Sequence, residues 1–151
     1  MTAPSHFPPQ QDSISRLLSK IHRHQQKQLV KKFQPYGLGG GHQYIFLINV
    51  LKMPGVNQDR LTCDLKFDKA TTARSIKQLE EAGYIDRQPD PHDGRAYRLY
   101  PTVKAIEFEP TLRDLLMQEN RKLVRALSEE EEMQLINLLQ ILDHSCEEAD
   151  G

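Results

Sequence analysis

The side chains of this sequence that could perform chemistry are mostly cations, and they gather between residues 57 and 102. Helical spacing would bring together Ala70, Arg74 and Lys77 as a small and cationic set, and Lys69 and Thr71 stand at the start of the same helix. Arg95 follows in a charged turn. Ammonium and guanidinium groups bind phosphate oxygens, and an arginine can donate two hydrogen bonds to a guanine edge. The set offers no apolar bulk to bury, so it predicts a helix that lies in the major groove of DNA.

The element that must carry this set is a helix between Asp68 and Gly83. Asp68 precedes Lys69-Ala70-Thr71, and its carboxylate can accept the unpaired N–H groups of a first helical turn. Gly83 stands where a left-handed residue ends a helix. The side predicted to face the core consists of Thr72, Ser75, Ile76 and Leu79, with Thr71 and Gln78 at the edges of the outer side.

A short helix and a hairpin flank this recognition helix in the sequence. Asn57 is expected to cap the short helix, Gln58 is a candidate clamp on the DNA backbone, and Cys63 is expected to be buried as a small apolar residue. Residues 84–88 and 96–100 alternate like half-buried strands. The segment 89–94 is rich in Pro, Asp and Gly, which predicts a turn and no strand.

In this order and spacing the stretch resembles the MarR family of winged-helix transcription regulators. Three segments carry the resemblance: Asp68-Lys69-Ala70-Thr71-Thr72-Ala73-Arg74, Leu79-Glu80-Glu81-Ala82-Gly83-Tyr84-Ile85 and Asp93-Gly94-Arg95-Ala96-Tyr97-Arg98-Leu99-Tyr100-Pro101-Thr102. It extends back to the glycine-rich residues 37–43 and covers about two-thirds of the chain. The implied fold is mostly α with a small β-hairpin wing, built on a winged helix-turn-helix core at residues 37–102.

The resemblance implies roles for single residues. Arg95 would enter the minor groove, with Asp93 holding its guanidinium by a charge-assisted hydrogen bond; a hairpin-closing ion pair is the alternative. Arg74 would contact bases or phosphates, and Ala70 could meet a thymine methyl group. Thr71 could read a base edge or act only within the helix start. This chain has Gly94 where many members carry a second basic residue.

The terminal segments are expected to form dimerisation helices at residues 12–36 and 103–147, after a flexible arm at residues 1–11. A long helix from Val103 to Leu127 is expected to be interrupted near Pro110, and Ser128 with Glu131 predicts a capping box at the start of the last helix. A stripe of cations in the first helix faces either solvent or the acidic last helix, in the same chain or in a second subunit.

Composition narrows the class of protein. Net charge is -1 over 151 residues, and mean hydropathy is -0.63. We expect one domain in the cytoplasm, because no secretory signal and no apolar run long enough to span a membrane is present. The glycines at 37–41 lack the spacing of a nucleotide loop, and the two cysteines fit no metal spacing. A zinc site at His22, His24 and His42 is a disfavoured alternative, because His22 and His24 face differently on a helix and no further ligands complete a set of four. No cofactor and no metal are expected.

These observations predict a homodimeric, sequence-specific regulator that binds double-stranded DNA at a pseudo-palindromic operator. More specifically, we expect a repressor that is released by a small-molecule effector. Tyr36, Phe46 and Phe108 are candidate effector-lining residues, with ordinary core packing as the alternative. A winged-helix module that binds only proteins is the second hypothesis. An enzyme is the third, and no nucleophile stands beside a base to favour it.

Overall fold

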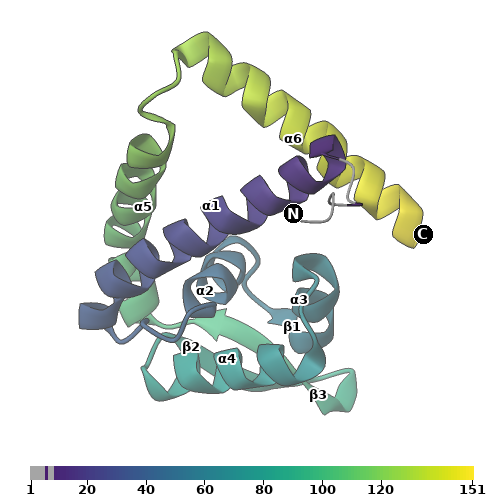
Figure 1. The fold of residues 1–151 in the computed structure, drawn as a ribbon. Coiled ribbons are helices and arrows are strands. Elements are labelled where there is room, and N and C mark those ends of the chain that lie inside the picture. Colours follow the sequence, from purple (N-terminus) through teal and green to yellow (C-terminus); the bar gives the residue numbers. More distant parts are fainter. Residues whose placement is uncertain (1–5, 7–8) are drawn as a thin grey trace. The chain divides into compact units, whose positions relative to one another are not determined.

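The computed structural model describes His6 and residues 9–151 (Figure 1), with side chains at His6 and from residue 13 onward. The elements in chain order are α1 (Pro9–Phe33), η1 (Gln34–Tyr36), α2 (Gln43–Lys52), β1 (Val56–Asn57), α3 (Gln58–Leu65), α4 (Lys69–Glu81), β2 (Ile85–Asp90), β3 (Asp93–Pro101), α5 (Val103–Val124) and α6 (Glu129–Asp150). They divide into one compact unit that ends at Leu115 and a second that begins at Leu116. The expected fold class, mostly helical with a β-hairpin wing, is confirmed.

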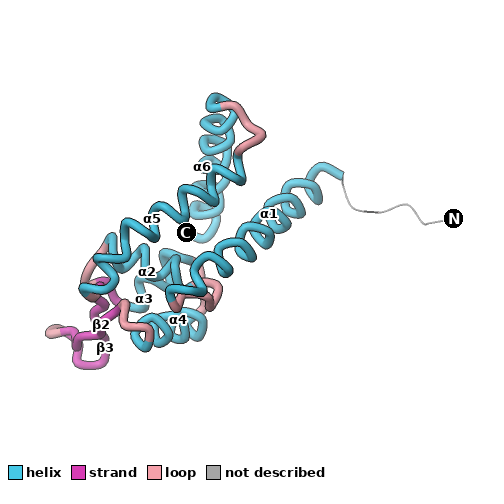
Figure 2. Tube along the Cα trace, turned by 90° about the vertical axis from the view of Figure 1, so that its left-hand side faces the viewer, coloured by secondary structure: helices cyan, strands magenta, loops and turns pink. Residues whose placement is uncertain are grey.

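The core of the first unit lies where α1, α2, α3 and α4 meet the base of the small sheet. Its fully buried side chains come from every one of these elements: Phe33, Phe46, Leu47, Val50, Leu61, Ile76, Leu79, Tyr84, Ile85 and Leu99. Burying a large apolar side chain contributes roughly 1.5–3 kcal/mol. The helices cover one end of the hairpin, and its far end projects beyond them (Figure 2).

The sheet has three antiparallel strands in the order β1-β3-β2. The two-residue strand β1 was not expected from the sequence; Val56 pairs with Leu99, on the side of β3 opposite Arg87. The expectation that residues 89–94 contain no strand is wrong, because β2 continues through Pro89 to Asp90. Proline is tolerated there because β2 is an edge strand, and the pairing is irregular between Pro89 and Asp90.

The ends of α3 and α4 follow the capping chemistry read from the sequence. The Asn57 side chain accepts from the N–H of Arg60 at 2.8 Å, and the Asp68 carboxylate accepts from the N–H of Thr71 at 2.6 Å. Gly83 has φ +82°, and the N–H of Tyr84 donates to the carbonyl of Leu79 across it. A left-handed glycine with this bond is a common helix ending, so the predicted bounds of the recognition helix are confirmed.

The outer helices differ from expectation in two places. Helix α1 begins at Pro9, so residues 9–11 belong to it and not to the expected arm 1–11; a proline suits a first helical turn because its missing N–H would have no partner there. The rest of that arm, His6 apart, lies outside the described residues. Helix α5 continues through Pro110 without the expected interruption, because Phe108 and Leu112 are buried on both sides of it.

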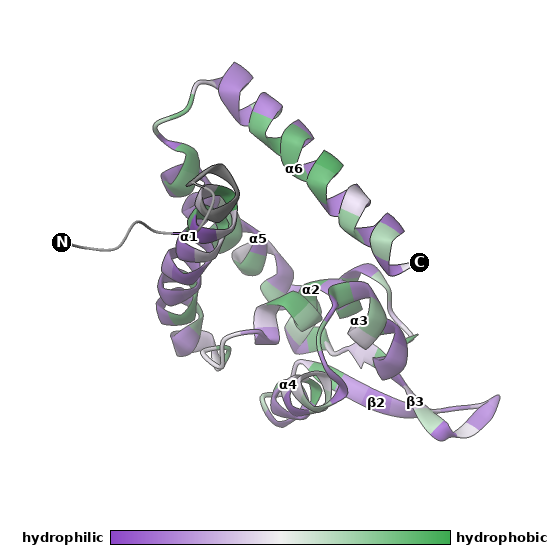
Figure 3. Ribbon diagram, turned by 45° about the vertical axis from the view of Figure 1, so that its right-hand side comes forward, coloured by the Kyte–Doolittle hydropathy of each residue, from purple (hydrophilic) through white to green (hydrophobic). Residues whose placement is uncertain are grey.

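The second unit holds the end of α5 and all of α6. The predicted capping box is present: the Glu131 N–H donates to the Ser128 hydroxyl at 3.1 Å, and the Ser128 N–H donates to the Glu131 carboxylate at 2.9 Å. Hydrophobic residues occur along the whole length of α6 (Figure 3), and all of its large ones are more than a third exposed. Among the described residues, no helix combines the length and the apolarity that crossing a bilayer requires.

Replacing Gly83 with alanine is expected to lower the free energy of unfolding by about 1–2 kcal/mol, because an L-residue with a Cβ is strained at φ +82°. Gly94→Ala is the matched control, since its φ is not positive and a Cβ there meets nothing within 4 Å. Urea unfolding followed by circular dichroism measures both variants. Equal stability of the two variants would contradict the role given to Gly83.

Candidate nucleic-acid interface

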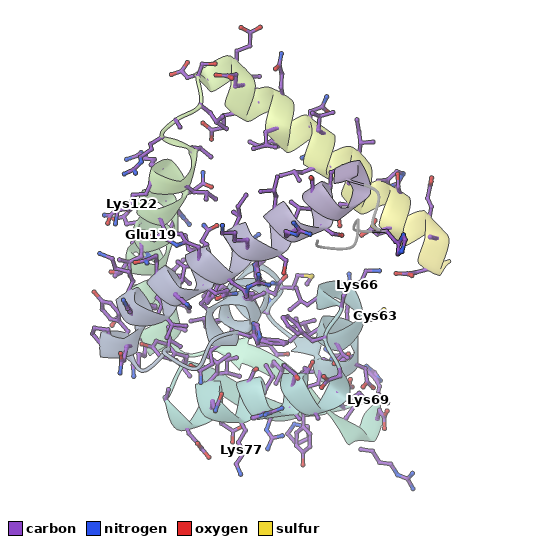
Figure 4. All side chains as sticks on the ribbon, in the orientation of Figure 1. Cys63, Lys66, Lys69, Lys77, Glu119 and Lys122 are labelled. Carbon is purple, nitrogen blue, oxygen red and sulfur yellow. The ribbon has the colours of Figure 1, made fainter. Side chains whose placement is uncertain are left out.

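The outer side of α4 is small, cationic and open to solvent. Ala70, Arg74 and Lys77 are exposed, as is Lys69 at the helix start, while Thr71 is half-buried. Lys69 and Lys77 are labelled in Figure 4, where Lys77 extends from the side of α4 that lies away from α2. The structure therefore brings the candidate residues of this helix onto one accessible surface, which carries cations at both ends.

The opposite side of α4 is fixed to the core by a mixture of apolar packing and hydrogen bonds. The four residues expected to face inward, Thr72, Ser75, Ile76 and Leu79, are all buried. The Thr72 hydroxyl donates to the carbonyl of Asp68 at 3.1 Å and lies 2.9 Å from the hydroxyl of Thr62 on α3. The Thr62 hydroxyl also lies 2.8 Å from the carbonyl of Gln58, so its single proton is shared between that carbonyl and the Thr72 oxygen. The contact between Thr62 and Thr72 links the two helices of the helix-turn-helix directly.

Arg95 lies on the exposed wing, but Asp93 does not hold its guanidinium as expected. The Asp93 carboxylate instead accepts from the backbone N–H of Arg95 at 3.1 Å. An aspartate commonly bonds to the N–H two residues further on, because its side chain has the length that closes such a turn. Asp93 therefore stabilises the backbone turn of the wing tip and does not fix the position of the Arg95 guanidinium.

An ion pair between Asp90 on β2 and Arg98 on β3 joins the two strands of the wing. The Asp90 carboxylate accepts from the N–H of His92 at 2.9 Å and from Nε of Arg98 at 3.3 Å. The bond from His92 is the main reason that the pKa of Asp90 lies below its usual value, and the bond to Asp90 raises the pKa of Arg98. Asp90 is thus charged at neutral pH and closes the hairpin.

The recognition helix and the wing are joined by a contact that the sequence reading missed. Nε of Arg87 on β2 lies 2.7 Å from the Glu80 carboxylate on α4, and the Arg87 guanidinium lies 4.9 Å from the ring centre of Tyr97 on β3. Seven residues separate Glu80 from Arg87 across a turn, and this spacing follows no helix or strand period. The only available signal was opposite charge.

Beside this contact, a hollow of about 280 Å³ brings the start of α3 next to the wing. Gln58 lines it from α3, and Arg95 and Tyr97 line it from β3. Two residues singled out separately in the sequence, Gln58 and Arg95, therefore share one surface recess. A duplex backbone that passes between the wing and α3 could reach both.

The three candidate effector residues do not form one site. A shallow recess of about 440 Å³ includes Tyr36, together with Tyr84 and Lys104. Phe108 lies behind it, 4.9 Å from Tyr36 between ring centres, whereas Phe46 is fully buried against Phe67 at 5.3 Å. Phe46 is a core residue in this structure, which agrees with the alternative of ordinary core packing. The Tyr84 hydroxyl donates to the carbonyl of Tyr36 at 2.6 Å, and burial raises the pKa of Tyr84.

The expected burial of Cys63 is wrong, since it is exposed on α3 (Figure 4). Leu61 faces the core, and a residue two positions later lies about 200° further round a helix, on the far side. Cys146 is also exposed, and both thiols are free. Within the described part of the chain, no three His, Cys, Asp or Glu side chains gather as metal ligands would.

Comparison with known proteins agrees with this geometry. A profile described as "MarR family" matches residues 42–97. The regulator BilQ of Clostridium symbiosum is 32% identical over 116 residues, which cover 77% of this chain and 80% of BilQ. A crystal structure of a MarR transcriptional regulator from Methanosarcina mazei Go1 superposes with a TM-score of 0.87 at 32% identity, over 91% of this chain and 99% of that one. A putative MarR family regulator from Listeria monocytogenes, crystallised with a 26mer DNA, gives a TM-score of 0.80 at 25% identity, over 86% of each chain.

The cap of α4 is expected to make stability depend on pH in the acid range. The N–H of Thr71 is the main reason that the pKa of Asp68 lies below its ordinary value of 3.8. A depressed folded-state pKa contributes stability that is complete above pH 3.8 and is lost as the pH falls through the folded-state value. Asp68→Asn keeps a capping oxygen but removes the titration.

Urea unfolding at pH 7, 4 and 2.5 measures the effect. The difference in stability between pH 7 and pH 2.5 should be smaller for Asp68→Asn than for the unchanged protein. Asp86→Asn is the control, because Asp86 is exposed on β2 and caps no helix. An equal pH dependence in all three proteins would contradict this account of Asp68.

Proposed function

This chain belongs to the MarR family of transcriptional regulators, and from that premise we propose that it is a homodimeric, sequence-specific DNA-binding protein. The observation that carries the proposal is the common exposure of the cationic side of α4 and of Arg95 on the wing. Arg74 and its neighbours would enter a major groove, and Arg95 the adjacent minor groove. The groups at this surface bind and orient a ligand and perform no reaction, so we propose no enzymatic role.

The DNA contacts divide by chemistry. Lys69, Lys77 and Gln58 would bind phosphates, which positions the protein without reading sequence. Arg74 would donate two hydrogen bonds to guanine, and Ala70 would accommodate a thymine methyl group. In the Listeria relative, DNA is bound in the crystal by a protein of the same fold. That likeness supports a duplex as the partner of this chain.

Dimer formation would follow from apolar surface that one chain leaves uncovered. On α1, Ile14 and Leu17 are 57% and 56% exposed. The exposed large apolar residues of α6 point in directions that together span more than half of the helix circumference: Leu135, Ile136, Leu138, Leu139, Ile141 and Leu142. A helix with so wide an apolar arc needs more than one neighbouring element, and a second subunit would supply it. Two subunits would present two recognition helices to a pseudo-palindrome.

We further propose repression released by a small molecule, with the recess at Tyr36 as the site. It combines aromatic rings with the ammonium group of Lys104, which lies 4.4 Å from the ring centre of Tyr84. A ligand would act by favouring a dimer whose two recognition helices no longer match the half-site spacing. A winged-helix module that binds only proteins would present an acidic or apolar side of α4, and the cations observed there disfavour it.

Arg74→Ala and Arg95→Ala are each expected to weaken binding to an operator upstream of the protein's own gene by about 5- to 150-fold, since a good arginine contact contributes roughly 1–3 kcal/mol. Arg113→Ala is the control: it removes the same charge from α5, where Arg113 pairs with Glu109 at 3.1 Å. Gel-shift titration at two salt concentrations measures all three. Affinities unchanged in both site variants would refute the assignment.

Leu138→Glu is expected to weaken dimerisation at least tenfold, because a carboxylate would be buried in an apolar interface. Asn137→Glu is the matched control on the same turn of α6, outside the apolar arc. Sedimentation velocity across a micromolar concentration range gives the association constants. A folded monomer of the unchanged protein throughout that range would argue against the homodimer.

A further inference from the structure

A chain of hydrogen bonds runs from the glycine-rich segment before α2 into the recognition helix. The N–H of Gly40 donates to Oε1 of Gln43 at 3.1 Å, and Nε2 of Gln43 donates to Oε1 of Gln78 on α4 at 2.8 Å. Gln43 is only 5% exposed, whereas Gln78 is half-buried at the edge of the outer side of α4. A buried amide thus makes direct contact with a side chain beside the candidate DNA surface.

The direction of every bond in this chain follows from its first member. A backbone N–H can only donate, so the Gln43 atom that faces Gly40 must be the oxygen. The amide nitrogen of Gln43 then faces Gln78 and can only donate, so Gln78 must offer its oxygen. The oxygen of Gln78 is therefore directed inward to Gln43, and its NH₂ group is left on the outer side.

Gly40 is required for this arrangement. A Cβ at residue 40 would lie 2.8 Å from Cδ and from Nε2 of Gln43, closer than real side chains approach. Moving the Gln43 amide away from such a Cβ would disturb its bond to Gln78. The close approach of the Gly40 backbone therefore fixes the Gln43 amide, and through it the Gln78 amide.

Gln78 lies on the same edge of α4 as two candidate base-contacting residues. Thr71, Arg74 and Gln78 are separated by three and four residues, so they follow one another along the same edge of the helix. A glutamine that reads adenine needs both its oxygen and its nitrogen for the two hydrogen bonds. Gln78 offers only the NH₂ group, which suits the O6 and N7 acceptors of guanine and the O4 acceptor of thymine, whereas adenine would leave its N6 donor without a partner.

We propose that Gln43, which does not touch DNA, determines which base Gln78 accepts by fixing its amide as a donor. The proposal rests on the proposed function, because it concerns the reading of DNA by α4. Gln43 is a positioning residue and Gln78 a specificity-determining one. The consequence is that a substitution at the buried residue alone should change the preferred sequence, in addition to any change in affinity.

The test uses the full-length protein and a pool of duplexes with randomised sequence, from which bound molecules are selected and sequenced. In Gln43→Glu, the carboxylate still accepts from Gly40 but cannot donate to Gln78. Gln78 must then turn its NH₂ group inward and present its oxygen to DNA. At one base pair per half-site, the preference should change by about fivefold or more from guanine or thymine to adenine or cytosine.

Gln78→Glu should produce the same change at the same base pair, because its carboxylate accepts from Gln43 on one side and presents an acceptor on the other. This variant alters a half-buried residue, so it keeps the test decisive if Gln43→Glu does not fold. Gln88→Glu adds the same charge to the exposed wing strand and should lower affinity without changing the preferred sequence.

An unchanged preference in Gln78→Glu, or in a Gln43→Glu protein whose thermal unfolding is normal, would overturn the proposal. So would changes at two different base pairs in the two variants. Failure of the proposed function looks different: the unchanged protein would then select no sequence from the pool. The unchanged protein therefore serves as the reference for both conclusions.

Discussion

The side of α4 that faces the core is narrow, and two of its four buried residues are the polar Thr72 and Ser75. Apolar packing by Ile76 and Leu79 holds the helix down, but it sets no direction for the polar groups. Those directions come from hydrogen bonds: Thr72 contacts Thr62 within the core-facing side, and Gln78 contacts Gln43 at its edge. A buried polar group without a partner costs about 1–3 kcal/mol, so a rotation of α4 that broke these bonds would be unfavourable. The bonds therefore favour one orientation of the helix.

The wing depends on α4 in turn. Glu80 and Arg87 form the contact between them, with side chains 41% and 39% exposed, so it contributes at most about 1 kcal/mol. Its importance is geometric, because Tyr97 confines the same guanidinium from the other strand. The base of the wing is fixed in the core by Ile85 and Leu99, whereas this contact beyond the base is exposed and contributes little.

The features that the sequence predicted well are local. Asn57, Asp68 and Gly83 act within one helical turn of their own position, so their chemistry is visible in a short window of residues. Contacts between distant residues were missed: β1 pairs with residues more than 40 positions away and is too short to alternate, and Gln78 meets Gln43 across 35 residues. The exposure of Cys63 could have been predicted, because Cys63 follows the buried Leu61 by two residues and so lies on the other side of the helix.

Pro89 has a consequence for the protein in solution. Strand β2 is one edge of the sheet, and an edge with free N–H and C=O groups can recruit a strand from another molecule. Pro89 has no N–H to offer, and the irregular pairing beside it bends the strand locally. Two wings that meet at their β2 edges would therefore pair poorly with each other. Pro89, which from the sequence was expected to exclude a strand, thus makes this edge of the sheet less prone to aggregation.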